Sequence, residues 1–331
     1  MPHPLAEQLG AISCFLYHNT LPRNFPHKFH FVLPRKLVFF PLGLADRYFL
    51  CYTLPYREVM LLRHGLKYPL LLVHGMGFRD YDLIRYWGRI PKALEQMGCR
   101  IYYGQQDSIA AVETNGRHIA QRIDEILRQT GAEKVNIIAH SKGGLDSRYA
   151  ISLAGAGSKV ASLTTVATPH HGSKTIDRLT KLPNWLIRLV SIYSNLSFRI
   201  LGDKHPDFDR VFRNFGTEEA RKFNAATPDH PEVYYQSYAF VMKRSSSDMI
   251  LWLPHKVVKG IEGENDGLLP VESVKWGNFR GTYCGAGNRG ISHLDEIDLR
   301  RRPFPGRHTE GITDIVDFYI EMVSELAERG F

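Results

Sequence analysis

The sequence predicts an α/β protein in which a mostly parallel central sheet carries helices on both faces. Short apolar runs, such as residues 69–73 (PLLLV) and 134–140 (KVNIIAH), alternate with segments whose apolar residues recur at helical spacing. These runs are continuously apolar, which is typical of strands that are buried on both sides of a parallel sheet. Because strand and helix alternate along the chain, we expect parallel strands joined by helical crossovers.

The expected elements follow in order from residue 68. Strands are predicted at residues 69–73, 99–104, 134–140, 159–169 and 232–240. Helices are predicted at residues 82–97, at 116–129, from 142 onward, and at 312–329. Pro91 lies within the first helical segment and is a candidate interruption of it. The last helix carries an apolar stripe, so we expect it to close the domain.

Two segments depart from this alternation. Residues 1–66 are rich in Phe, Tyr, Leu, Pro and His, and their prolines exclude a long helix. Short strands are expected there at residues 28–32 and 36–40. We interpret residues 1–66 as an N-terminal extension that packs on a main domain formed by residues 67–331. Residues 173–231 interrupt the main domain with an apolar insertion, which predicts a lid or cap.

Composition narrows the function classes. The chain has 331 residues and a formal net charge of +8, and its basic residues are scattered and form no recognition motif. We therefore expect a solvated basic surface and no nucleic-acid partner. The apolar run at residues 37–45 is too short to cross a bilayer, and no secretory signal pattern is visible. We expect a cytoplasmic location, with secretion as the alternative if a signal was removed. Four cysteines without a CxxC pair favour free thiols over a zinc site.

A serine lies in a small-residue turn between the third predicted strand and the helix after it. The pattern is Ala139-His140-Ser141-Lys142-Gly143. A serine hydroxyl must stand clear of the sheet to react, and a tight strand-to-helix turn achieves this when its neighbours are small. The following helix also directs backbone N–H groups at the space above Ser141. The alternative is an ordinary serine N-cap.

Three further motifs favour catalysis over a simple cap. A glycine-containing loop directly follows the first strand of the main domain and consists of His74, Gly75, Met76 and Gly77. Such a loop can supply a backbone oxyanion donor. Asp266 lies in a glycine turn, and His293 lies before the last helix. The order Ser141, Asp266, His293 is the order that α/β-hydrolases use.

Together these motifs resemble the bacterial triacylglycerol lipases of the Pseudomonas and Burkholderia type, which have the α/β-hydrolase fold. The resembling pieces include residues 74–94, 133–150, 166–177 and 292–297. The resemblance implies a serine ester hydrolase in which Ser141 is the nucleophile. It implies that His293 is the general base and acid and that Asp266 orients it. The oxyanion hole would be formed by the backbone N–H groups of Met76 and Lys142.

The sequence departs from this family in several places. Ala139 replaces the first motif glycine, and Lys142 stands where histidine is common. The family also holds a structural calcium near the catalytic histidine. Asp295 matches one carboxylate ligand and Asp248 is the candidate for another, but Leu299 stands where a glutamine is expected. Calcium requires an oxygen-rich shell, so we expect a depleted site. The reaction itself should require no cofactor.

The expected reaction is hydrolysis of carboxylic esters through an acyl-enzyme. The apolar lid segment favours lipid-like substrates and a transient contact with a lipid interface, which the basic residues Arg188 and Arg199 would suit. An acyltransferase would use the same residues, with an alcohol in place of water. A non-catalytic ligand-binding protein is a further alternative, but Ser141, Asp266 and His293 are all present.

Overall fold

The computed structural model describes residues 39–40, 49–50, 65–77, 79, 85–304 and 311–331. The chain divides into two compact units, residues 1–63 and 64–331. In the first unit, strand β1 (Phe39–Phe40) pairs antiparallel with β2 (Phe49–Leu50). The strand predicted at residues 28–32 lies outside the described residues. That the extension packs on the main domain stays a prediction.

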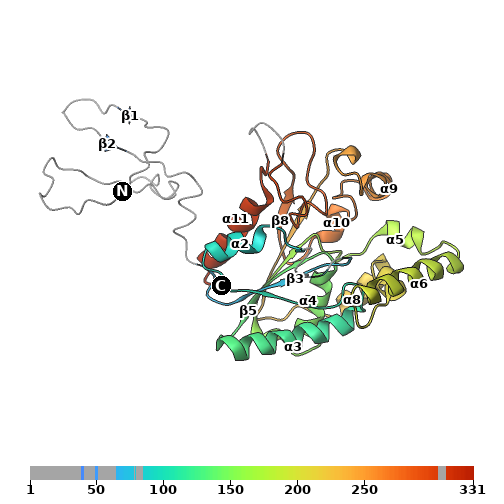
Figure 1. Ribbon diagram of the computed structural model, residues 1–331, viewed down its shortest axis with the longest axis horizontal. Coiled ribbons are helices and arrows are strands. Elements are labelled where there is room, and N and C mark those ends of the chain that lie inside the picture. Colours follow the sequence, from blue (N-terminus) through green and yellow to red (C-terminus); the bar gives the residue numbers. More distant parts are fainter. Residues whose placement is uncertain (1–38, 41–48, 51–64, 78, 80–84, 305–310) are drawn as a thin grey trace, which may run out of the picture. The chain divides into compact units, whose positions relative to one another are not determined.

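A parallel sheet of six strands forms the centre of the second unit (Figure 1). Its order is β4-β3-β5-β6-β7-β8, and every neighbouring pair is parallel. The strands are β3 (Leu70–Val73), β4 (Ile101–Tyr103), β5 (Val135–His140), β6 (Val160–Val166), β7 (Tyr234–Phe240) and β8 (Asn278–Tyr283). The five strands predicted for the main domain are confirmed, and β8 is an addition at the edge.

Helices cover both faces of the sheet. One face carries α2 (Ile90–Gln96) and α11 (Ile315–Glu328), and the other carries α3 (Val112–Thr130) and α4 (Lys142–Ser152) (Figure 1). The sheet separates two apolar cores accordingly. Leu70 and Leu72 lie in the core with α2 and α11, whereas Leu71 and Val73 lie in the core with α3. Successive strand residues point to opposite faces, so an unbroken apolar run serves both cores.

The first predicted helix is shorter than expected. Residues 86–89 form turns, and α2 begins at Ile90 with Pro91 in its first turn. Residues 82–84 lie outside the described part of the chain. A first-turn proline has no hydrogen bond to lose. Pro91 therefore starts the helix, and the expectation that it interrupts a longer one is wrong.

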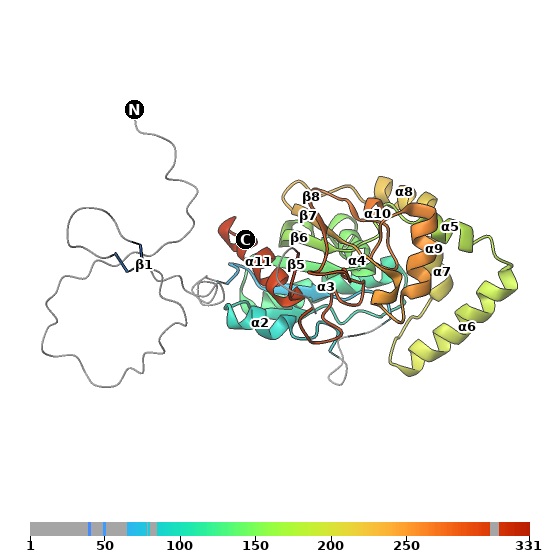
Figure 2. The ribbon, with the colours of Figure 1, turned by 90° about the horizontal axis from the view of Figure 1, so that it is seen from above.

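The remaining helices lie mostly in two insertions. Between β6 and β7 the chain forms α5 (Lys174–Leu179), α6 (Asn184–Ile200), α7 (Phe208–Asn214) and α8 (Thr217–Ala226). Between β7 and β8 it forms the 3-10 turn η2 (Ser245–Ser247), α9 (Trp252–Glu262) and α10 (Val271–Val274). One more 3-10 turn, η1 (Gly157–Lys159), precedes β6. Helix α6 lies at the margin of the unit, far from the sheet (Figure 2).

Two cysteines fall within the described residues, and both are free thiols. Cys99 is buried, and burial raises the pKa of its thiol, whereas Cys284 is half-buried. Cys14 and Cys51 lie outside the described residues. In the described part of the chain, no helix is long and apolar enough to cross a membrane.

Candidate active site

Ser141 occupies a strained turn between β5 and α4. Its backbone has φ 54° and ψ −130°, a conformation that non-glycine residues rarely adopt and that costs about 1–3 kcal/mol. Such strain persists only where the surrounding structure enforces it, and it is common at functional sites. The hydroxyl of Thr168 donates to the backbone oxygen of Ser141 at 2.8 Å, and the N–H of Ser141 donates to Val166 O at 2.9 Å. The turn is therefore held from β6 and the residues that follow it.

Glycines make the close packing of this turn possible. A Cβ on Gly143 would lie 2.4 Å from His74 O, and one on Gly144 would lie 2.2 Å from the hydroxyl of Thr168. Neither position tolerates a side chain. Ala139, by contrast, is an ordinary residue of β5, paired in register with Val73 and Thr165 and buried in the core that contains α3. Alanine therefore fits where the family motif has its first glycine.

Asp266 and His293 lie in direct contact. The Nδ1 atom of His293 lies 2.7 Å from Oδ2 of Asp266. The other oxygen of Asp266 accepts the N–H groups of Leu268 and Leu269 at 2.8 and 2.7 Å. Asp266 is buried, so its carboxylate is fixed by three donors. With Nδ1–H donating to this carboxylate, Nε2 of neutral His293 is the unprotonated nitrogen and can accept a proton.

The ring of His293 lies at the serine turn. It packs against the ring of His140, with centroids 4.4 Å apart, and His140 directly precedes Ser141. The loop after β3 meets the same turn, since a Cβ on Gly75 would lie 2.8 Å from Cβ of Ser141. The structure thus brings together the serine, the histidine and the glycine loop from three separate parts of the chain.

A buried chain of hydrogen bonds connects these parts. The N–H of Gly75 donates to the hydroxyl of Tyr86 at 2.8 Å, and that hydroxyl lies 2.7 Å from Nδ1 of His140. Nε2 of His140 lies 2.9 Å from Oε2 of Glu296. The N–H of Gly75 donates to Tyr86, and the directions of the other two hydrogen bonds follow from the tautomer of His140.

Burial determines the charge states along this chain. It lowers the pKa of His140 well below its ordinary value, and the neighbouring His293 lowers it further. Burial also raises the pKa of Glu296 well above its ordinary value, with Asp266 as the next cause. Oε2 of Glu296 lies 3.7 Å from Nδ1 of His293. A neutral His140 therefore fits its place between Tyr86 and Glu296, and Asp266 is the carboxylate closer to His293.

Hydrogen bonds within the loop and to Gln106 hold the loop of residues 74–77 in place. The ring nitrogens of His74 lie 2.8 and 3.0 Å from the carbonyl oxygens of Gly75 and Gln106, and the side-chain amide of Gln106 donates to His74 O at 2.8 Å. Gly77 has φ +97°, which favours glycine. The candidate oxyanion donors are the N–H of Met76 in this loop and that of Lys142. Lys142 is the first residue of α4, where an N–H has no acceptor within the helix.

The side chain of Lys142 forms a buried ion pair. Its Nζ lies 2.7 and 2.8 Å from the two carboxylate oxygens of Asp146, and the amide of Asn115 donates to Asp146 at 2.9 Å. Burial raises the pKa of Asp146, and Lys142 partly offsets that rise. The lysine that replaces the usual histidine therefore has a structural partner one helical turn along α4.

Two groups of side chains are candidates for metal binding. His140, His293 and Glu296 place one ligand atom each within 4.8 Å of one another. Hydrogen bonds to Tyr86, Asp266 and each other already engage them. Asp248 and Asp295, the calcium ligands suggested by the sequence, lie together as well. The hydroxyl of Ser292 is 2.8 Å from Asp248 and 2.9 Å from Asp295.

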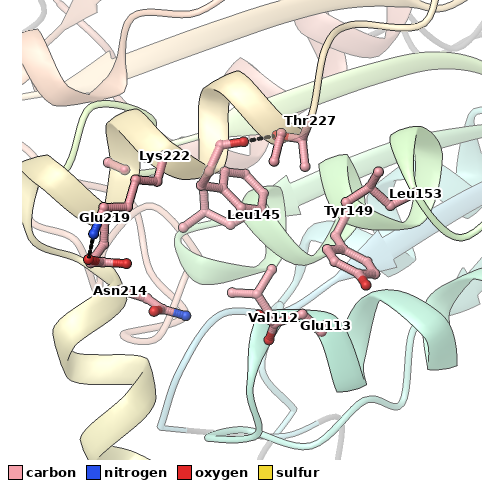
Figure 3. Close-up of a pocket in the computed structure, with 12 residues that line it drawn as sticks. Val112, Glu113, Leu145, Tyr149, Leu153, Asn214, Glu219, Lys222 and Thr227 are labelled. Carbon is pink, nitrogen blue, oxygen red and sulfur yellow. Dashed lines mark hydrogen bonds and ion pairs between the residues drawn. The ribbon is translucent and has the colours of Figure 1, made fainter.

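A cavity of about 290 Å³ lies between α3, α4 and α8 (Figure 3). Leu145 and Tyr149 of α4 face Val112 of α3 across it, and the ion pair of Glu219 and Lys222 lies at one side. Its lining includes none of the three candidate catalytic residues.

Two residues of the site have no role in the sequence-based prediction. Tyr86 is predicted only as part of a helix face, and Glu296 is given no role although it lies three residues after His293. Glu296 could have been noticed in the sequence, because it is an acidic residue three positions after His293. Tyr86 gives no such signal, because its role depends on Gly75 and His140, which lie on other elements.

A parallel sheet with a strained serine turn after its central strand and an Asp–His pair beside that turn defines the class of α/β hydrolases. Comparison with known proteins agrees. The family described as alpha/beta hydrolase fold matches residues 68–239. The triacylglycerol lipase of Pseudomonas fragi is 37% identical over 298 residues, which cover 80% of this chain and 97% of that protein. Triacylglycerol lipase 2 of Saccharomyces cerevisiae is 31% identical over 266 residues, 75% of each chain.

Solved structures agree on the fold. A metagenomic carboxyl esterase superposes with a TM-score of 0.63 at 16% identity and covers 80% of this chain and 78% of its own. The mature lipase BlEst2 of Bacillus licheniformis gives a TM-score of 0.54 at 24% identity, over 71% of this chain and 88% of its own. The chain belongs to the α/β-hydrolase fold family and, within it, to the triacylglycerol lipases related to the Pseudomonas enzymes. It is a carboxylic ester hydrolase.

Proposed function

We propose that this hydrolase cleaves lipid-like carboxylic esters through an acyl-enzyme on Ser141. The observation that carries the proposal is the 2.7 Å contact between His293 and Asp266 next to the strained turn of Ser141. A serine needs a base beside it and a third group that orients the base. His293 and Asp266 have the geometry for these two roles.

The proposed reaction has two stages. Oγ of Ser141 attacks the ester carbonyl while Nε2 of His293 takes its proton. The tetrahedral intermediate collapses, the alkoxide leaves with the proton from His293, and the acyl group stays on Ser141. Water then attacks the acyl-enzyme and loses its proton to His293. The second tetrahedral intermediate collapses, His293 returns the proton to Oγ of Ser141, and the acid is released. The N–H groups of Met76 and Lys142 are the proposed donors to the oxyanion, each worth about 3 kcal/mol of transition-state stabilisation.

The substrate class is supported by an apolar surface on the candidate lid, residues 173–231. In α6 the buried residues are Ile187 and Ser191, and most of its other large apolar side chains are exposed. These exposed side chains are Trp185, Leu186, Leu189, Val190, Ile192, Tyr193, Leu196 and Ile200. Residues of and before α9 add Met249, Ile250, Trp252, Leu253 and Val257. Exposed apolar surface of this extent is typical of contact with a lipid or a protein partner.

A lipid interface is the partner we propose for this surface. Arg188 and Arg199 lie on α6 among its exposed apolar residues, and they would suit an anionic interface. The expectation of lipid-like acyl chains follows, because a helix that binds an interface can deliver an insoluble ester to Ser141. The acyltransferase alternative uses the same residues and differs only in the acceptor of the second stage.

The test is hydrolysis of p-nitrophenyl esters from acetate to palmitate by the wild type and by Ser141→Ala. We expect the variant to lose about 10⁴-fold or more of kcat, and the wild type to prefer the longer chains. Ser158→Ala, which changes an exposed serine in η1, is the matched control and should behave as wild type. Equal activity of Ser141→Ala and wild type would refute the proposed nucleophile.

Two further arms separate the alternatives. Reactions supplemented with a primary alcohol would reveal an acyltransferase if ester product exceeds free acid.

Binding to vesicles of anionic phospholipid tests the proposed lipid interface, and we expect Trp185→Ser and Leu189→Ser to weaken this binding. Leu153→Ser, which changes an exposed leucine at the end of α4, is the control. If the α6 variants bind vesicles as well as this control does, the proposed role of α6 is wrong.

A further inference from the structure

The turn that carries His293 is tied to the segment before α9 by a compact group of charges. Asp248 and Asp295 are both almost fully buried, and Arg289 and Arg300 converge on them. The group holds two carboxylates and two guanidinium groups. It lies where the family resemblance would place a structural calcium.

Each arginine links both sides of the group. Arg289 donates through Nη2 to Oδ2 of Asp295 at 2.8 Å and through Nε to Ser247 O at 2.8 Å. Arg300 donates through Nη2 to Oδ2 of Asp248 at 3.0 Å and to Ser247 O at 3.1 Å. Its Nε lies 3.3 Å from Oδ1 of Asp295, within ion-pair distance but outside hydrogen-bond geometry.

These residues do not fit calcium. Calcium takes six to eight oxygen ligands at about 2.3–2.6 Å, whereas here both carboxylates and the carbonyl of Ser247 receive N–H donors. The two positive groups already balance the two aspartates, so a divalent cation would face two guanidinium charges at close range. Leu299, which precedes Arg300, supplies an apolar side chain where an amide was expected.

The aspartates also hold the turn itself. The N–H of Ser292 donates to Oδ2 of Asp295 at 3.1 Å, and its hydroxyl contacts both aspartates. Oδ1 of Asp248 accepts the N–H groups of Ile250 and Leu251 at 2.9 and 3.2 Å, and its Oδ2 accepts from Nη2 of Arg300 at 3.0 Å. The residues fixed in this way flank His293 on both sides.

We propose that Arg289 and Arg300 take the place of the structural calcium that the resemblance to the lipase family implies, so that the turn of His293 is positioned by guanidinium groups and needs no calcium. Both arginines are positioning residues, because they act through Asp295, Asp248 and Ser292 and touch no reacting atom. The consequence for activity rests on the proposed role of His293. The consequences for stability and for calcium binding do not.

The first measurement is the melting temperature and kcat of the wild type after dialysis against EDTA and after addition of CaCl₂, with MgCl₂ as the control salt. We expect the melting temperature to change by less than about 1 °C and kcat by less than about twofold, because Arg289 and Arg300 keep the turn intact. A loss of stability in EDTA that CaCl₂ restores would overturn the proposal, whatever the esterase assays show.

The second measurement uses variants. Arg300→Ala leaves the buried Asp248 without its arginine, and Arg289→Ala leaves Asp295 with only the longer contact to Arg300, so we expect the melting temperature to fall by about 5–10 °C. We expect kcat to fall about 10- to 100-fold with little change of KM, because the base is displaced and the substrate contacts are not. Arg300→Lys should recover part of both. Arg302→Ala, which changes an exposed arginine two residues further on, is the matched control. Variants that match this control in stability and kcat would overturn the proposal.

The third measurement asks whether the guanidinium groups occupy a cation position. The double variant Arg289→Gln and Arg300→Gln leaves Asp248 and Asp295 beside the Ser247 carbonyl, an oxygen set that calcium favours. We expect millimolar CaCl₂, but not MgCl₂, to raise its melting temperature, and calorimetry to detect calcium binding that the wild type lacks. If calcium does not bind to the double variant, the proposal that the two arginines take the place of a cation is refuted.

Discussion

The buried pair of Lys142 and Asp146 gives a prediction whose magnitude follows from the structure. Both side chains are 1% exposed, and Nζ of Lys142 lies 2.7 and 2.8 Å from the two carboxylate oxygens. Asp146→Asn leaves the ammonium of Lys142 buried without a counter-charge, and removing one member of a buried pair costs about 3–5 kcal/mol. For a domain of this length, that corresponds to a fall in melting temperature of roughly 6–10 °C.

The two members of the pair should respond unequally. Lys142→Met leaves Asp146 without its cation, but burial already raises the pKa of Asp146, so this carboxyl can take up a proton and become neutral. We therefore expect Lys142→Met to cost less than Asp146→Asn. The double variant Lys142→Met and Asp146→Leu removes both charges and should recover most of the loss, because an apolar pair of similar volume replaces them.

Urea unfolding of the four proteins, followed by tryptophan fluorescence, measures these differences. Activity is a second readout, since the proposed oxyanion donor at residue 142 is the backbone N–H and not the side chain. Lys142→Met should therefore keep kcat within about tenfold of wild type, well short of the roughly 10²–10³-fold loss seen when an oxyanion donor is removed. The reasoning is refuted if Asp146→Asn costs less than about 1 kcal/mol, or if the double variant is no more stable than Asp146→Asn.

Three further predictions concern the serine turn and the hydrogen-bond chain behind it. Ser141→Gly should abolish ester hydrolysis yet raise the unfolding free energy by about 1 kcal/mol, because glycine relieves the strain at φ 54°; urea unfolding against Ser141→Ala checks this. Tyr86→Phe should lower kcat about tenfold with little change of KM, because the N–H of Gly75 loses its acceptor; steady-state kinetics on one ester checks this. The pKa of Glu296 is raised in the folded state, so the unfolding free energy of the wild type should decline as the pH rises above the unfolded-state pKa near 4.5 and through the folded-state pKa. Glu296→Gln has no titrating carboxyl and should lack this decline. Unfolding free energies of both proteins at several pH values between about 4 and 9 check this, and the same pH dependence for both would contradict it.

The parts of the fold that could be predicted from the sequence are those whose signals are local. Strands such as β5 and β6 are buried on both faces, and their unbroken apolar runs are visible in the sequence. Strand β8 (NFRGTY) is a partly exposed edge strand without such a run, so periodicity could not reveal it. The helix predicted at α2 is too long because apolar side chains in the preceding turns, among them Trp87, also face the core.

The candidate site likewise divides into residues with a local sequence signal and residues without one. Ser141, Asp266 and His293 each lie in a recognisable local motif, and the structure places the last two in contact beside the first. The hydrogen-bond chain that runs from Gly75 through Tyr86 and His140 to Glu296 contains direct contacts between residues up to 156 positions apart, as between His140 and Glu296. The contact of Arg300 with Asp248 spans 52 positions. No local pattern encodes such pairings, because they arise only when the sheet brings its loops to one edge.

Helix α6 has a consequence for engineering. Because Ile187 and Ser191 are its buried residues, most of its side chains contribute little to the folded core. Substitutions along its outer side should therefore be nearly neutral for folding, and its sequence can vary widely under selection for a new surface. The same helix offers a natural point for adsorbing the enzyme to an apolar support. Attachment there would leave the sheet, and the turn of Ser141, undisturbed.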